Sequence, residues 1–157
     1  MIAPVPAIAV ETPLSADMGE MIAELNDLLL TLSPPEACYH MTAEEMSGEA
    51  TTVFVARIDG KAAACGALHR HADGIAEVKR MYTRPAYQGL GLGSSILDRI
   101  IELATREGIS MLVLETGDKH PAAWRIYERA GFSRCGPVLD YPDSPYSIFY
   151  SRPLAAA

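Results

Sequence analysis

The sequence contains few cysteines and no long apolar run, and each shortage argues against a class of protein. Its three cysteines, Cys38, Cys65 and Cys135, are odd in number and widely spaced. This spacing disfavours a disulfide scaffold or a zinc site and favours the reducing cytoplasm. No apolar stretch reaches the length that crosses a bilayer, so no membrane partner is expected. The apolar segment Met1 to Val10 has no basic residues before it, so no secretory signal is predicted.

Positive charge is also scarce. The chain has 13 Lys and Arg against 20 Asp and Glu, a net charge of −7, which disfavours nucleic acid as a partner. The acidic balance mildly favours a cationic or amine acceptor. With 157 residues, 49% of them hydrophobic, the chain suits one globular domain. Residues 1–157 are therefore predicted to form a single domain.

Hydrophobic periodicity predicts an α/β protein with the order β-α-α-β-β-β-α-β-α-β-β. Ser15 is a predicted helix N-cap, and Thr42 with Glu45 resembles a capping box. Asp59-Gly60 predicts a two-residue hairpin turn. The expected strands cover 3–10, 52–58, 61–70, 75–82, 111–114, 132–138 and 147–152; the expected helices cover 15–32, 42–47, 91–107 and 121–130.

The segments 75–82, 91–107 and 111–114 form strand, helix and strand in succession. The last strand is almost wholly apolar, as expected for a strand buried on both faces. A strand, a crossover helix and a second strand predict a right-handed parallel β-α-β unit at the centre of a mixed sheet.

A glycine-rich loop, Gln88 to Ser94, lies at the start of the helix in this unit. Glycines alternate there at Gly89, Gly91 and Gly93, which leaves the backbone N–H groups of the helix start uncovered. The helix dipole adds partial positive charge, so the loop is typical of a phosphate site. Ser94 stands where the nucleotide-hydrolase loop requires lysine, and the third glycine of the dinucleotide fingerprint is missing.

The remaining pattern, Gln88-x-x-Gly91-x-Gly93, resembles the pyrophosphate loop of the GNAT superfamily of acyl-CoA-dependent N-acetyltransferases. The predicted element order is also that of the superfamily, and Leu114 to Phe132 is similar to its signature for one strand and the helix after it. The C-terminal segment 136–147 resembles a group of small, mostly uncharacterised bacterial acetyltransferases. The resemblance implies a GNAT-like mixed sheet and acetyl-CoA as acyl donor co-substrate, with no metal. The expected reaction is direct attack of a primary amine, on a small molecule or a peptide, on the thioester.

The resemblance also implies where the donor binds. The pantetheine arm would pair with the backbone of Met81 to Thr83, and the diphosphate would lie on the glycine loop. His120 stands where the family usually has an asparagine that contacts the pantetheine arm; histidine can also donate and accept. The alternative for His120 is a helix-start residue that faces water. The predicted cofactor-binding residues are Met81, Tyr82, Thr83, Gln88, Gly89, Leu90, Gly91, Leu92, Gly93, Ser94, His120 and Ala123.

Glu77 is the predicted general base. Charged residues in an interior strand are costly unless paired, so Glu77, Lys79 and Arg80 together indicate a site. The alternative is an internal ion pair of Glu77 with Lys79 or Arg80 that has no part in catalysis. Strand alternation places Glu77 and Met81 on one face, about 13 Å apart, which favours proton transfer through a water.

Tyr127 is the predicted general acid for the departing thiolate. It lies about two helical turns after His120, so its phenol could reach the sulfur. The alternative is a core tyrosine with a satisfied hydroxyl. His69 and His71 share a strand face, but no carboxylate or cysteine completes a metal set beside them.

Two functions of different classes stay open at this point: an N-acetyltransferase, and a non-catalytic acyl-CoA-binding or sensing GNAT-like domain. A phosphate-loop protein of another class is disfavoured by the missing lysine. The acceptor is expected between residues 30–46 and 139–145, which do not identify it. The oligomeric state is open, and a homodimer is possible.

Overall fold

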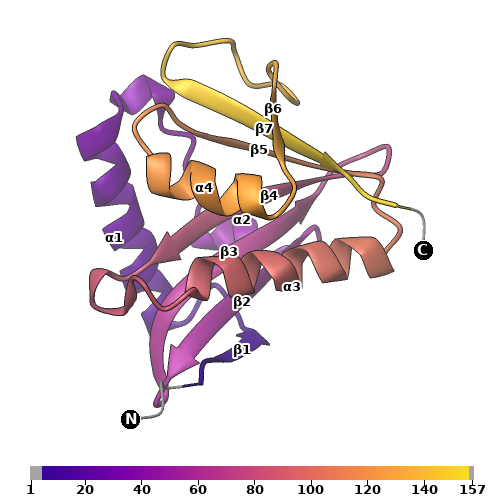
Figure 1. Ribbon diagram of the computed structural model, residues 1–157. Helices are drawn as coiled ribbons and strands as arrows, with labels where there is room; N and C mark the ends of the chain where they lie inside the picture. Colours follow the sequence, from indigo (N-terminus) through magenta and orange to yellow (C-terminus); the bar gives the residue numbers. More distant parts are fainter. Residues whose placement is uncertain (1–4, 156–157) are drawn as a thin grey trace.

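The computed structural model describes residues 5–155 (Figure 1). Within them, no helix is long and apolar enough to cross a membrane. The strands are β1 (Ala7–Val10), β2 (Thr51–Ile58), β3 (Lys61–Arg70), β4 (Ile75–Thr83), β5 (Met111–Gly117), β6 (Ser133–Cys135) and β7 (Ser147–Pro153). The helices are α1 (Ala16–Leu32), α2 (Ala43–Met46), α3 (Leu92–Arg106) and α4 (Pro121–Arg129), with short 3-10 turns at Pro35–Ala37 and Pro85–Tyr87.

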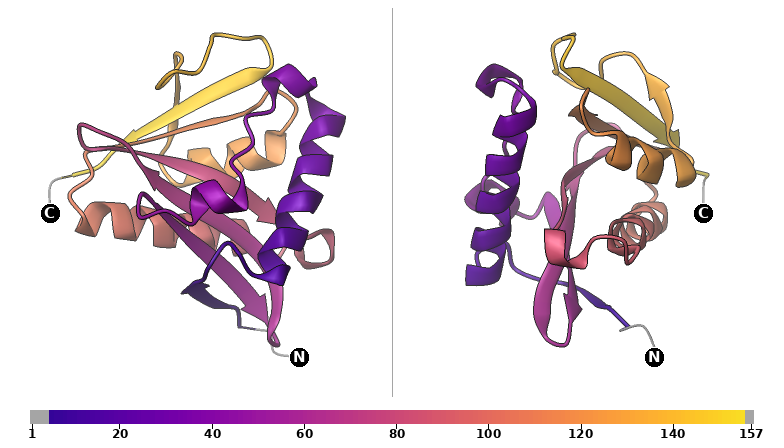
Figure 2. Two further views of the ribbon diagram at one scale, coloured as in Figure 1. Left: turned by 180° about the vertical axis from the view of Figure 1, so that it is seen from behind. Right: turned by 60° about the vertical axis from the view of Figure 1, so that its left-hand side comes forward.

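The strands form one seven-stranded mixed sheet in the order β1-β2-β3-β4-β5-β7-β6. Only β4 and β5 run parallel, joined by the crossover helix α3, and the other neighbouring strands of this sheet are antiparallel. Helix α1 covers one face of the sheet, while α3 and α4 cover the other (Figure 2). The predicted α/β class, element order and central parallel unit are confirmed.

The local signals explain most element boundaries. The Ser15 side chain accepts a hydrogen bond from the backbone N–H of Met18, and Thr42 and Glu45 form the predicted capping box. Asp59 and Gly60 have φ of 52° and 79°, the left-handed conformation that a two-residue hairpin turn requires.

Two strand predictions were too long. The expected strand 132–138 extends only over Ser133–Cys135, because Gly136 and Pro137 interrupt it and proline has no N–H to donate to the sheet. The expected strand 3–10 begins at Ala7, and its first two residues lie outside the described part of the chain.

Each face of the sheet has its own hydrophobic core. The larger core lies under α3 and α4, and the smaller one under α1 and α2. The buried residues of the larger core include Phe54, Leu68, Val78, Ile96, Ile100, Leu112, Leu114, Tyr127 and Tyr150. Those of the smaller core are Met18, Met21, Met41, Met46, Val53, Val55, Ala62, Cys65 and Ala67.

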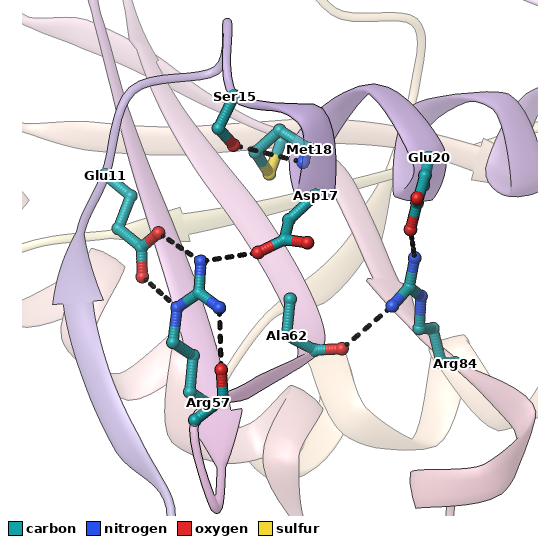
Figure 3. A network of polar contacts seen from close by, with 9 residues as sticks. Glu11, Ser15, Asp17, Met18, Glu20, Arg57, Ala62 and Arg84 are labelled. Atoms are coloured by element: carbon teal, nitrogen blue, oxygen red, sulfur yellow. Dashed lines mark hydrogen bonds and ion pairs between the residues drawn. The ribbon is translucent and has the colours of Figure 1, made fainter.

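Two arginines tie the start of α1 to the sheet (Figure 3). The guanidinium of Arg57 donates to both oxygens of Glu11 at 2.8 Å and contacts Asp17 at 2.9 Å. The guanidinium of Arg84 contacts Glu20 at 2.9 Å and Glu24 at 3.1 Å. Both arginines therefore have carboxylate counter-charges.

A bulge in β4 overturns the prediction that Glu77 and Met81 share a face. Lys79 is paired with Ala67 and Tyr82 with Cys65, so β4 carries one extra residue against β3. The extra residue is Arg80, which has a positive φ of 56°. Beyond it the alternation is shifted, and the side chain of Met81 packs against the core under α3. Glu77 lies between Ala76 and Val78, which point into that core, and so faces the opposite side.

The close packing of β3 against α3 depends on Gly66. A Cβ at this position would lie 2.3 Å from the sulfur of Met81 and 2.8 Å from Cγ2 of Ile96. Gly66→Ala should therefore lower the free energy of unfolding by about 1–3 kcal/mol in urea denaturation. Gly19→Ala, at an exposed position of α1 where a Cβ would meet nothing within 4 Å, should raise it by about 0.5–1 kcal/mol. Equal stability of Gly66→Ala and the unmodified protein would contradict this account.

Candidate active site

A cavity of about 790 Å³ lies where β4 and β5 separate. The two strands pair only from Ile75 with Met111 to Glu77 with Val113. Past that point β4 remains paired with β3, while its other edge has no strand beside it. The cavity is lined by this edge, by the glycine loop, by α4 and by the segment after α1.

The glycine loop forms one end of the cavity. Gly89 and Gly91 have positive φ of 82° and 76°, and Gly91 is the N-cap of α3 without a side-chain cap. The first N–H groups of α3 therefore have no intrahelical acceptors. All the nominated cofactor-binding residues line the cavity except Leu90, whose side chain is largely exposed to solvent.

Glu77 is buried at the other end of the cavity and has three partners. One carboxylate oxygen lies 3.0 Å from Nε2 of His71, and the other lies 3.4 Å from Nζ of Lys79 and accepts a hydrogen bond from the hydroxyl of Tyr141. The ion pair with Lys79 is thus present, and Arg80 has no part in it. The His71 side chain is about 30% exposed, so it links the buried carboxylate to the surface.

Tyr141 was not among the predicted catalytic residues. Lys79 Nζ donates to its hydroxyl at 2.8 Å, and its ring packs edge-on against Tyr39 at 5.0 Å. Burial, and then the neighbouring charge of Glu77, raise the pKa of the Tyr141 phenol, so it stays protonated at neutral pH. Its place in a proline-rich loop gave no local signal that it would reach β4.

Glu115 is a second carboxylate at the site that the sequence did not single out. It lies on β5, two residues beyond the partner of Glu77, and lines the same cavity. Burial raises the pKa of Glu115, while a 2.7 Å hydrogen bond from the Ser147 hydroxyl opposes that rise. A carboxylate directly after the apolar run Met111 to Leu114 was the available signal.

Tyr127 is buried in α4 and lines the cavity. Its ring packs against Phe132 and Tyr150 at centroid distances of 6.0 and 5.9 Å. Its hydroxyl makes no hydrogen bond to a side chain or backbone group among residues 5–155, while its ring belongs to the core under α3 and α4. Burial raises the pKa of the Tyr127 phenol, which keeps its proton in place at neutral pH.

His120 is half-buried at the start of α4 and also lines the cavity, rather than facing water. Its ring packs on Gly117, where a Cβ would lie 2.5 Å from it. Burial lowers the pKa of His120, and Nε2 has no partner within the described part of the chain. A neutral imidazole there can donate to or accept from a bound molecule.

His69 and His71 lie edge to face at 4.8 Å, but each has its own polar partner. Nδ1 of His69 lies 2.7 Å from the hydroxyl of Thr51, and His71 contacts Glu77. Among residues 5–155, no group of three or more His, Cys, Asp or Glu side chains is arranged to hold a metal ion.

Comparison with known proteins gives consistent matches. The sequence profile of the Acetyltransferase (GNAT) family matches residues 20–132. The IAA acetyltransferase of Azospirillum brasilense is 34% identical over 148 residues, which cover 94% of this chain and 97% of that protein. The uncharacterised N-acetyltransferase YsnE of Bacillus subtilis is 34% identical over 125 residues, 78% of this chain and 83% of YsnE.

Solved structures match over nearly the whole chain. A crystal structure of a Klebsiella pneumoniae protein assigned as an acyl-CoA N-acyltransferase matches with a TM-score of 0.81 and 27% identity. The match covers 96% of this chain and 98% of the Klebsiella chain. The ribosomal-protein-S18-alanine N-acetyltransferase of Escherichia coli matches with a TM-score of 0.70 and 21% identity. This match covers 98% of the present chain and 96% of the Escherichia coli chain. The second likeness concerns the fold alone.

Proposed function

Because the chain belongs to the GNAT family of acetyltransferases, we propose that it transfers an acetyl group from acetyl-CoA to a primary amine of a small molecule or peptide. The observation that supports this best is a single cavity with an uncovered helix N-terminus at one end and Glu77 at the other. The three cysteines are unpaired in the structure, in keeping with the cytoplasm as the site of action.

Residues of the glycine loop hold the donor diphosphate in this proposal. The N–H groups at the start of α3 donate to phosphate oxygens, and the absence of Cβ atoms lets the diphosphate approach the backbone. The free edge of Met81 to Thr83 hydrogen-bonds the pantetheine arm. Nε2 of His120 makes a further polar contact with that arm.

The chemistry is a direct transfer between two bound substrates. The amine nitrogen forms a bond to the thioester carbon, the backbone N–H near Met81 stabilises the oxyanion, and the carbon–sulfur bond then breaks. Glu77 takes the amine proton through a water, and Tyr127 gives its proton to the leaving thiolate. A water carries this proton because Glu77 lies four residues before Met81, about 13 Å along β4.

A screen of amines with acetyl-CoA, followed by release of free thiol, tests this function. The panel holds alkylamines, amino acids and peptides with free N-termini. IAA, the compound in the name of the Azospirillum relative, is tested separately. Thiol release that depends on one class of amine, with the acetylated product found by mass spectrometry, is the expected result. Tight binding of acetyl-CoA without thiol release from any amine would instead favour the non-catalytic acyl-CoA-sensing domain.

Gly91 offers a separate test of the donor site. Asn and Asp both tolerate a positive φ better than other residues and have the same size, so Gly91→Asn and Gly91→Asp differ only in charge. Acetyl-CoA at 100 times its dissociation constant should stabilise the unmodified protein by about 2.7 kcal/mol. The Asn variant should keep most of this stabilisation and the Asp variant should lose it, because the carboxylate repels the diphosphate. If calorimetry gives both variants the same affinity for acetyl-CoA, the diphosphate does not bind at this loop.

A further inference from the structure

Arg80 is a buried cation without a counter-charge. Its residue is 7% exposed and lines the cavity. One terminal nitrogen donates to the side-chain oxygen of Asn26 on α1, and Nε has no partner among residues 5–155. Asn26 is neutral, so this hydrogen bond leaves the positive charge uncompensated.

Other arginines of the chain show the contrast. Arg57, Arg70 and Arg84 each contact one or more carboxylates at 2.6–3.1 Å, although all three are more exposed than Arg80. Burying a charge without a partner is unfavourable because the charge loses its hydration. Burial lowers the pKa of the Arg80 guanidinium, and the neighbouring Cys65 thiol opposes that shift. No carboxylate among residues 5–155 forms an ion pair with Arg80.

The backbone at Arg80 is itself in a costly conformation. A φ of 56° is uncommon outside glycine, and such backbone strain is found most often at functional sites. The bulge sends the Arg80 side chain to the α1 side, where Lys79 also lies. Lys79 is already neutralised by Glu77, and Arg129, the other arginine that lines the cavity, is exposed on α4. Arg80 is therefore the buried arginine on the α1 side that can bind an anion in the cavity.

We propose that the acceptor carries a carboxylate that binds Arg80, so that the substrate is a small aminocarboxylic acid such as an amino acid. This inference rests on the proposed N-acetyltransferase function. The planar guanidinium suits a carboxylate because it can form two parallel hydrogen bonds. Arg80 lies three positions after Glu77, about 10 Å along β4, a distance that a small molecule and one water can bridge. Tyr39, Tyr141, Leu28 and Leu29 supply apolar walls for its carbon skeleton.

Matched pairs of acceptors test the inference on the unmodified protein. Each standard L-amino acid is compared with its α-carboxamide, which keeps the amine and the side chain and removes the negative charge. In thiol release, the reactive acids should exceed their amides in kcat/KM by about 100-fold or more. Amides that react as well as their acids would overturn the inference and leave the acetyltransferase function standing.

Substitution of Arg80 is a second, independent test of the inference. Arg80→Gln should lower kcat/KM for the acids by about 100-fold, abolish the preference over amides and leave the affinity for acetyl-CoA unchanged. Arg80→Lys keeps the charge but cannot form two parallel hydrogen bonds. Its kcat/KM for the acids should therefore lie between that of the unmodified protein and that of Arg80→Gln. Arg57→Gln, which removes an arginine outside the cavity, should keep the acid preference. Loss of acetyl-CoA affinity in Arg80→Gln would mean that Arg80 binds a donor phosphate instead, and would overturn the inference.

Direct binding separates this inference from the proposed function. Saturation-transfer NMR with the same acids and amides in the presence of CoA needs no turnover. Binding of an acid but not its amide supports the inference even if no amine releases thiol, in which case only the acetyltransferase function fails. If none of the acids binds, the inference that Arg80 binds a carboxylate of the acceptor is wrong, whether or not Arg80→Gln folds.

Discussion

Replacing Tyr127 with phenylalanine should lower kcat by about 10²–10⁴-fold and leave the affinity for acetyl-CoA close to that of the unmodified protein. The change removes the only proton donor proposed for the thiolate and keeps the ring that packs against Phe132 and Tyr150. Because the hydroxyl has no protein partner among the described residues, stability should change little. Single-turnover thiol release measures the chemical step directly.

Tyr150→Phe is the matched control for this prediction. Its ring lies 5.9 Å from that of Tyr127, but its hydroxyl donates to Glu128 at 2.6 Å and does not line the cavity. This variant should lose about 1 kcal/mol of stability and keep its kcat. If Tyr127→Phe keeps the full single-turnover rate, Tyr127 has no part in protonating the thiolate.

Replacing Glu77 with glutamine should lower kcat/KM by about 10²–10⁴-fold, again with acetyl-CoA binding intact. Glutamine preserves the shape of the side chain but cannot take the amine proton. The value of kcat/KM with the best acceptor of the panel provides the measurement.

Lys79→Gln separates a catalytic Glu77 from a structural one. This variant breaks the same ion pair but leaves the carboxylate with His71 and Tyr141. A catalytic Glu77 predicts a far smaller loss for Lys79→Gln than for Glu77→Gln. Equal losses of kcat/KM in the two variants would make Glu77 a structural partner of Lys79. The base would then be sought among the histidines, of which His71 touches Glu77 and His120 lines the cavity.

The fold could be predicted where the governing interactions are local. Ser15 and the capping box of Thr42 and Glu45 mark helix starts, and Asp59-Gly60 marks a hairpin, through contacts within a few residues. The bulge at Arg80 could not be predicted in this way, because no glycine or proline marks it. Its register is set by pairing with β3, and it reverses which face Met81 occupies.

The residues of the candidate site also differ in how far the sequence could predict them. The glycine loop, Glu77 and Tyr127 each belong to a short sequence pattern that can be recognised without knowing the fold. Tyr141 and Glu115 are distant from β4 in the sequence and reach the cavity from a loop and from β5, so their roles depend on the assembled sheet. Arg80 was considered only as a partner of Glu77, whereas the bulge directs it to Asn26.

The two halves of the sheet are joined at β4 and β5 by three residue pairs, Ile75 with Met111 through Glu77 with Val113. Beyond this seam, the free edge of β4 presents amide and carbonyl groups that a neighbouring strand would ordinarily satisfy. An extended chain with amides of its own, such as a pantetheine arm, can fill the gap as a surrogate strand. The seam would then lengthen on binding, and the protein would reach its stiffest form with its donor in place.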